Sequence, residues 1–204
     1  MIEPLACKLG HNDETPNIEL AERLCNNMDR QGIREIADGL QSKEQAIASD
    51  CIKVLYEVGY RKPELIVDYA DDFINGLSHK NNRIVWGSMT ALAYVATIKA
   101  EAIYNRLPEI IAAYKKGSVI TVDNCVSVFA WVCKANPDYQ VKVFPILLED
   151  LAHCRAKEIP QHAERMVVCI DSGNKQAFLS VLEARMDELS ETQKKRVQKL
   201  IKKI

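Results

Sequence analysis

The sequence lacks the features that mark several large classes of protein. No uncharged apolar run approaches the ~18 residues that a membrane-spanning helix needs. The first residues, MIEPLACKLGHNDE, have neither the basic start nor the apolar stretch of a signal peptide. Acidic and basic residues nearly balance, 28 against 27, so the chain as a whole has no general attraction for nucleic-acid phosphates. We expect neither a membrane span nor general nucleic-acid binding.

Signals for disulfides, cofactors and catalysis are missing as well. The seven cysteines are an odd number, and no two of them have C-x-x-C spacing. Most fall on apolar helical faces, where a free cysteine behaves as a small hydrophobic residue. This pattern predicts reduced thiols and a cytoplasmic protein. No G-x-x-x-x-G-K-[ST] loop, dinucleotide-binding turn, nucleophile elbow or H-E-x-x-H motif occurs. We therefore predict no enzymatic activity, no catalytic residue, no metal and no cofactor.

Apolar residues recur instead with the period of an α-helix. Hydrophobic residues make up 48% of the chain and charged residues 27%, which is a globular balance. No segment alternates with period 2 beyond a few residues, whereas the apolar side chains between 63 and 77 form one helical stripe. This stripe consists of Leu65, Ile66, Tyr69, Phe73, Ile74 and Leu77. The composition and the period together predict an all-α protein.

Capping signals help to place the helix boundaries. Ser42 and Ser190 each precede a glutamine by three residues, as in a capping box, and Pro63 and Pro137 suit first helical positions. The expected helices span residues 17–28, 31–40, 43–58, 63–77, 82–97, 99–116, 121–135, 138–153, 158–171, 174–189 and 191–203. Residues 1–16 carry no such pattern and are expected to be a flexible N-terminus.

The expected helices pair into a repeat of about 38 residues, in which equivalent positions are apolar. One second-helix column with steps of 38 contains Leu65, Ile103, Val141 and Leu179. Two more columns share a one-residue deletion: Tyr69, Leu107, Phe144 and Leu182, and Phe73, Ile111, Leu148 and Met186. The first helices contribute Val54, Leu92, Ala130 and Val168, and Leu55, Ala93, Trp131 and Cys169. Because one helical pair cannot bury its apolar face alone, neighbouring pairs are predicted to stack.

Several of these residues resemble a known repeat family. Leu107-Pro108 and Phe144-Pro145 resemble the Leu-Pro start of the second helix in HEAT repeats, and residues 81–92 resemble the first-helix pattern. Trp86 stands where that family usually has arginine, so the ladder of Asp and Arg between repeats is absent. Over residues 43–190 the chain is thus similar to the HEAT/armadillo family of α-solenoids. The resemblance implies a right-handed superhelix of helical hairpins, with the second helices lining a concave face.

The resemblance also implies how the chain is organised and what it does. Residues 17–204 are expected to form a single HEAT-like repeat domain, with hairpins at about 17–41, 43–77, 81–116, 119–153 and 157–189 and a capping helix at 191–203. We predict a protein–protein interaction scaffold that binds a protein or peptide with some basic residues through its concave face. The alternative function is a HEAT-like nucleic-acid-binding protein or DNA-repair enzyme.

Charged residues on the second helices form the candidate partner-binding surface. The candidates are Asp68, Asp71, Asp72, Arg106, Glu109, Lys142, Glu149 and Asp150. Asp68 and Asp72 are one helical turn apart, so their like charges would lie side by side. The alternative interpretation of all eight residues is an ordinary solvated surface.

Three further features have alternative interpretations. Residues 192–204 carry six basic residues and no acidic one, which suits either a helix that caps the last repeat or a contact with an anionic surface. Trp86 and Trp131 are predicted to pack between helical layers. Cys154, Glu158 and His162 have the spacing of metal ligands on a helix. A proline at 160 interrupts that helix, so no metal site is predicted there.

Overall fold

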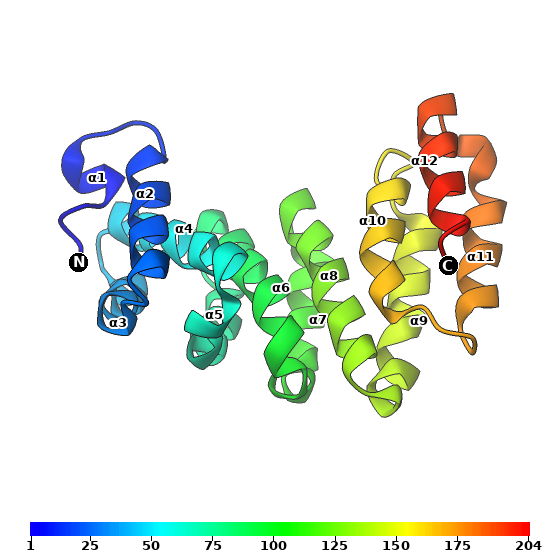
Figure 1. Ribbon diagram of the computed structural model, residues 1–204, viewed down its shortest axis with the longest axis horizontal. Helices are drawn as coiled ribbons and strands as arrows, with labels where there is room; N and C mark the ends of the chain where they lie inside the picture. Colours follow the sequence, from blue (N-terminus) through cyan, green and yellow to red (C-terminus); the bar gives the residue numbers. More distant parts are fainter. The chain divides into compact units, whose positions relative to one another are not determined.

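The protein folds into helices and turns without a β-strand, as the sequence predicts (Figure 1). The computed structural model describes residues 1–204. The chain divides into two compact units, Met1–Cys125 and Val126–Ile204, which are described one at a time below. The division falls inside helix α8 (Val119–Ala135), within the range that the sequence analysis assigned to one repeat domain. None of the helices is both long enough and apolar enough to cross a membrane.

The first unit is built from helices that pack through aliphatic stripes. Its helices are α1 (Ala6–Leu9), α2 (Thr15–Asn26), α3 (Arg30–Asp38), α4 (Gln45–Arg61), α5 (Ala70–Gly76), α6 (Asn82–Asn105) and α7 (Leu107–Lys116). Helix α4 packs against both α2 and α6, and α5 packs against α6. Val54, Leu55 and Leu92 are completely buried at these contacts, as the first-helix columns predict. Trp86 of α6 packs on Tyr56 of α4, with ring centroids 5.7 Å apart.

The second helices of this unit are more broken than predicted. Residues 63–77 do not form one helix, because two 3₁₀ turns, Pro63–Leu65 and Val67–Tyr69, precede the short α5. Between the turns Ile66 has φ −118° and ψ 3°, outside the helical region. The predicted boundary near residue 98 is confirmed by a kink at Lys99 (φ −116°, ψ 38°) within α6, and a second break that was not predicted follows at Arg106. Pro108 explains the break, since a proline ring starts a helix easily but interrupts one that is under way.

The buried positions of the second helices also differ from the predicted columns. Val141 was predicted to be a core residue, yet 76% of it is exposed. In the third column the completely buried residues are Phe73, Ile110 and Leu147, which recur at steps of 37. Because one residue turns an α-helix by about 100°, an error of one residue moves a column away from the core. The repeat is therefore real: Leu65, Ile103, Phe144 and Leu182 are buried as predicted, and the error of one residue affects Ile111 and Leu148 of the third column.

The N-terminal segment is packed, in contrast to the flexible segment that was predicted. Leu5 is completely buried beside helix α1. The backbone N–H of Ala6 donates to Asn17 Oδ1 at 3.0 Å, and that of Cys7 donates to Asp50 Oδ2 at 2.7 Å. The polar character of residues 1–16 concealed these contacts, because they depend on partners that are distant in sequence.

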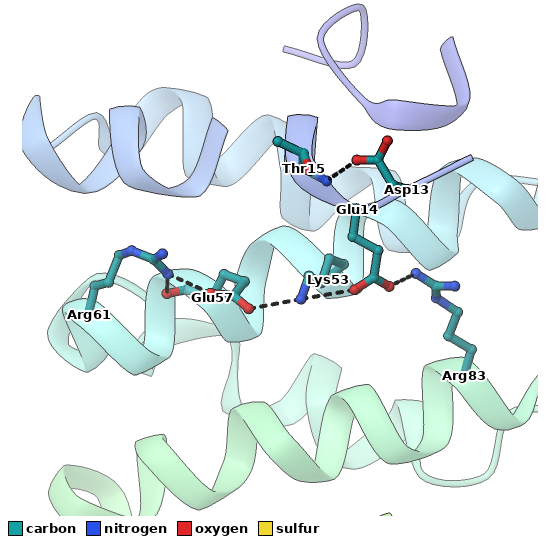
Figure 2. Close-up of polar contacts among 7 residues, drawn as sticks. All are labelled: Asp13, Glu14, Thr15, Lys53, Glu57, Arg61 and Arg83. Carbon is teal, nitrogen blue, oxygen red and sulfur yellow. Dashed lines mark hydrogen bonds and ion pairs between the residues drawn. The ribbon is translucent and has the colours of Figure 1, made fainter. Parts of the chain in front are cut away.

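A chain of alternating charges joins the N-terminal segment to α4 and α6 (Figure 2). Lys53 Nζ lies 3.0 Å from Glu14 Oε2 and 2.8 Å from Glu57 Oε1, and only 8% of the Lys53 side chain is exposed. At the two ends of this series of charged side chains, Glu57 pairs with Arg61 at 2.6 Å and Glu14 pairs with Arg83. Glu14, the residue before α2, thus pairs with side chains of two long helices, α4 and α6.

The second unit contains the rest of α8 followed by α9 (Pro137–His153), α10 (Ile159–Met166), α11 (Lys175–Ala184) and α12 (Glu191–Ile201). Helix α9 packs against α10 and α11, and α12 packs against α10. The predicted capping box of α12 is confirmed by reciprocal hydrogen bonds between Ser190 and Gln193. The capping box predicted at Ser42 is absent, because α4 begins at Gln45 with Glu44 as its N-cap residue. Val197 of α12 is completely buried against the unit.

Candidate functional site

Two open grooves lie between successive second helices of the first unit. The α3–α5 groove, of about 510 Å³, is bounded by α3 on one side and by the segment from Leu65 to Asp72 on the other. The α5–α7 groove, of about 530 Å³, is bounded by the end of α5, the turn that follows it, the first turn of α6, and α7. Each groove separates helices that occupy equivalent places in consecutive hairpins. The repeat of helical pairs therefore creates a repeat of grooves.

The α3–α5 groove is lined by charged side chains of both signs. Its lining residues are Arg30, Gln31, Arg34 and Asp38 from α3, and Leu65, Asp68, Tyr69 and Asp72 from the opposite side. The three carboxylates outnumber the two guanidinium groups, which makes the groove net acidic. Asp68 lies 3.8 Å from Lys99 in a solvent-exposed ion pair, which contributes little to stability.

The surroundings of Asp72 in this groove disfavour the charged form of its carboxylate. Burial raises its pKa, and the nearby charges of Asp71 and Asp38 raise it further. The side chain of Asp72 forms no ion pair or hydrogen bond within the protein. Tyr69, whose pKa is also raised by burial, lies in the same field of charges. A cation placed in the groove would relieve the repulsion among the carboxylates.

The α5–α7 groove has the opposite charge balance. Lys80, Arg106 and Lys116 line it together with a single carboxylate, Glu109. Arg106 Nε donates to Glu109 Oε1 at 2.6 Å, and Arg106 Nη1 lies 3.3 Å from Asp71. The pKa of Glu109 is lowered mainly by its hydrogen bond with Arg106. The two lysines stay available for an anionic group, and the apolar floor includes Ile74, Leu77 and Val85.

The structure separates the predicted candidates of the first unit into three places. Asp68 and Asp72 line the α3–α5 groove, whereas Arg106 and Glu109 line the α5–α7 groove. Asp71 lines neither groove; its side chain is 82% exposed and pairs with Arg106. The predicted acidic patch is thus divided, and one of its members is partly neutralised.

In the second unit the prediction is wrong for one of three residues. Lys142 and Glu149 are exposed on α9, as a contact surface requires. Asp150 is buried, and its Oδ2 lies 2.6 Å from His162 Nδ1, so it cannot meet a partner in a groove. Asp150 was predicted to lie on a polar face because the sequence does not reveal that His162 of α10 packs against this side chain.

Sequence analysis missed the contribution of α3 to the site. Arg34 and Asp38 face Asp68 and Asp72 across the α3–α5 groove. A signal was present, because each of the two pairs has i, i+4 spacing and the second pair follows the first by 34 residues. The predicted repeat columns begin in the hairpin at 43–77, so they do not include α3.

Comparison with known proteins identifies the fold and nothing finer. No family model matches the sequence, and no curated protein matches it either. Among solved structures, an engineered protein from the Northeast Structural Genomics Consortium has a TM-score of 0.69 at 15% identity, over 98% of this chain and 95% of its own. A computationally designed armadillo repeat protein for modular peptide recognition has a TM-score of 0.64 at 12% identity, over 92% of this chain and 91% of its own. Another designed armadillo repeat protein has a TM-score of 0.62 at 11% identity, with 99% of both chains covered.

These similarities define the class of protein. The chain has the armadillo/HEAT-type helical repeat fold, an all-α solenoid of stacked hairpins, as the sequence predicted. On this fold, activity depends on individual sites and does not follow from the architecture.

Proposed function

We propose that this protein is a non-catalytic scaffold that binds an extended peptide segment of a partner protein in the two grooves of its first unit. The observation that carries the proposal is the α3–α5 groove, where Asp38 and Asp72 are close enough to repel each other and neither has a cationic partner. A lysine or arginine of the partner would supply the missing charge.

The neighbouring groove refines the kind of partner. Because Lys80 and Lys116 line the α5–α7 groove, an acidic side chain of the same peptide would suit it. Helix α5 contributes residues to both grooves, so one continuous segment could occupy the two in succession. The partner segment we propose therefore carries a basic residue and, a few positions away, an acidic one.

Other features of the fold and the sequence support the proposal. A solved structure of the same fold was designed for modular peptide recognition, which makes peptide binding a reasonable use of such grooves. All seven cysteines are free, and we propose the reducing cytoplasm as the location. The net acidic α3–α5 groove disfavours the alternative function of nucleic-acid binding, because it would repel phosphate groups.

The proposal is tested by fluorescence polarisation with labelled synthetic peptides. These peptides carry a lysine pair and a glutamate pair, joined by spacers of varied length in both orders. We expect saturable binding that weakens about tenfold in the Asp38→Asn, Asp72→Asn double variant, since two ion pairs of about 0.7 kcal/mol each make about 1.4 kcal/mol. The control is Glu101→Gln, an exposed carboxylate of α6 that lines neither groove. Equal affinity of the double variant and the control would refute the assignment of the groove.

A further inference from the structure

Three different metal-binding side chains meet in the second unit. Asp150, Cys154 and His162 bring a carboxylate, a thiol and an imidazole together, and one donor atom of each lies within 4.8 Å of the other two. Asp150 lies in the last turn of α9, and Cys154, four residues later, is the C-cap residue whose backbone N–H donates to the carbonyl oxygen of Asp150. His162 comes from the first half of α10, which packs against α9.

We propose that these three residues bind one Zn²⁺ ion, which clamps the end of α9 to the start of α10. Thiolate, imidazole and carboxylate are the ligands that zinc uses in proteins, and a mixed set of the three favours zinc over magnesium or calcium. The fourth position of the tetrahedron is taken by a water molecule. Two anionic ligands balance the charge of the ion.

The spacing of the donors suits this ion after a small adjustment. Tetrahedral coordination with bonds of about 2.0–2.3 Å places neighbouring donor atoms about 3.3–3.6 Å apart. His162 Nδ1 and Asp150 Oδ2 are now 2.6 Å apart, and no pair in the cluster exceeds 4.8 Å. The ion would therefore separate the first pair slightly and draw the thiol inward by about 1 Å.

The surroundings hold the ligands in place. Arg185 Nη1 donates to the carbonyl oxygens of Leu151 at 3.0 Å and Cys154 at 2.7 Å, which fixes the end of α9 where two of the ligands lie. The same guanidinium is 3.8 Å from Cys154 Sγ, but its charge is matched by Glu188, whose Oε1 accepts from Arg185 Nε at 2.8 Å. The guanidinium therefore does not oppose a cation with an unbalanced charge.

The burial of the cluster indicates a structural role for the ion. The side chain of His162 is completely buried and only 4% of the Asp150 side chain is exposed, while Cys154 is half-buried at the rim. A substrate could not reach the buried imidazole, but a metal ion can be enclosed between α9 and α10 as the protein folds. The sequence analysis rejected a site at Cys154, Glu158 and His162 because Pro160 interrupts the helix that they would share. Glu158 pairs with Arg155, and Asp150 takes its place.

The test measures metal binding by the full chain after EDTA treatment and reduction. Zn²⁺ is titrated in competition with a chromophoric chelator, and Co²⁺ is added separately as a spectroscopic probe of thiolate ligation. We expect one Zn²⁺ per chain, a raised midpoint of thermal unfolding, and a thiolate-to-cobalt charge-transfer band. Cys154→Ser should abolish the band and weaken Zn²⁺ binding at least tenfold, whereas Cys7→Ser, which changes a half-buried cysteine of the other unit, should bind as the unmodified chain does.

The choice of Cys154 keeps the test decisive, because substitution of buried Asp150 or His162 could prevent folding. Far-UV circular dichroism checks the fold of Cys154→Ser, and Cys154→Ala replaces it if serine disturbs the helix end. The proposal is overturned if the full chain binds no stoichiometric Zn²⁺. It is also overturned if the cobalt band persists in the folded Cys154 variant, or if the band is lost in Cys7→Ser.

Discussion

Replacing Lys53 tests whether the charge chain of Figure 2 holds the N-terminal segment in place. In Lys53→Ala, Glu14 and Glu57 lose the cation between them, although Arg83 and Arg61 stay beside them. Removal of one partner from a buried ion pair costs about 3–5 kcal/mol. Because 39% of the Glu14 side chain is exposed and both acids keep a partner, we expect the lower end, about 3 kcal/mol.

The same network predicts how the effect depends on pH. Burial alone would raise the pKa of Glu57, but its hydrogen bonds to Lys53 and Arg61 outweigh burial and lower that pKa from its ordinary value of 4.5. A lowered pKa in the folded state contributes stability above the unfolded-state value, and this stability is lost as the pH falls through the folded value. The difference between the unmodified chain and Lys53→Ala should therefore be full at pH 7 and shrink below about pH 4.5.

The assay is urea unfolding followed by circular dichroism. With a denaturant slope of about 2 kcal/mol per molar, a loss of about 3 kcal/mol lowers the urea midpoint by about 1.5 M. Lys43→Ala is the matched control, since Lys43 is exposed just before α4 and has no ion pair. Equal midpoints for the two variants at pH 7 would show that the network does not stabilise the fold.

Three other substitutions or reactions test particular contacts. Gly87→Ala should destabilise by about 1–3 kcal/mol, since an added Cβ would lie 2.7 Å from buried Ile52; a raised thermal midpoint, as helix propensity alone predicts, would contradict this. Ser190→Ala should cost about 1 kcal/mol and speed amide hydrogen exchange in the first turn of α12, and unchanged exchange would argue against the cap. Burial, and then the charge of Asp50, raises the pKa of Cys51 from 9.0 to about 12, so iodoacetamide at pH 8 should alkylate it about 1000-fold more slowly than an ordinary thiol; rapid labelling of the folded chain would be evidence against this.

The parts of the fold that the sequence could predict depend on local patterns. The first helices follow a regular aliphatic stripe, so Val54 and Leu92 were correctly placed in the core. The Ser190 cap was predictable because both of its partners lie within four residues. The second helices were harder, since the unusual backbone of Ile66 has no short-range signature.

The candidate site was only partly predictable for a related reason. The exposed aspartates of the second hairpin could be recognised from polar spacing, and Asp72 does line a groove. The opposite wall comes from Arg34 and Asp38, which reach the site only because α3 lies beside α5 in space. The burial of Asp150 under His162 likewise depends on how α10 returns onto α9.

A charge-swap cycle at Asp72 tests the central claim, that the α3–α5 groove captures a cationic side chain. The affinities of the unmodified chain and Asp72→Lys are measured for a bound peptide and for the same peptide with its lysine pair changed to glutamate. We predict that each single change weakens binding and that the two changes together restore it, with a coupling of about tenfold or more. Additive losses, with no recovery in the doubly changed complex, would mean that the peptide cation does not contact this groove.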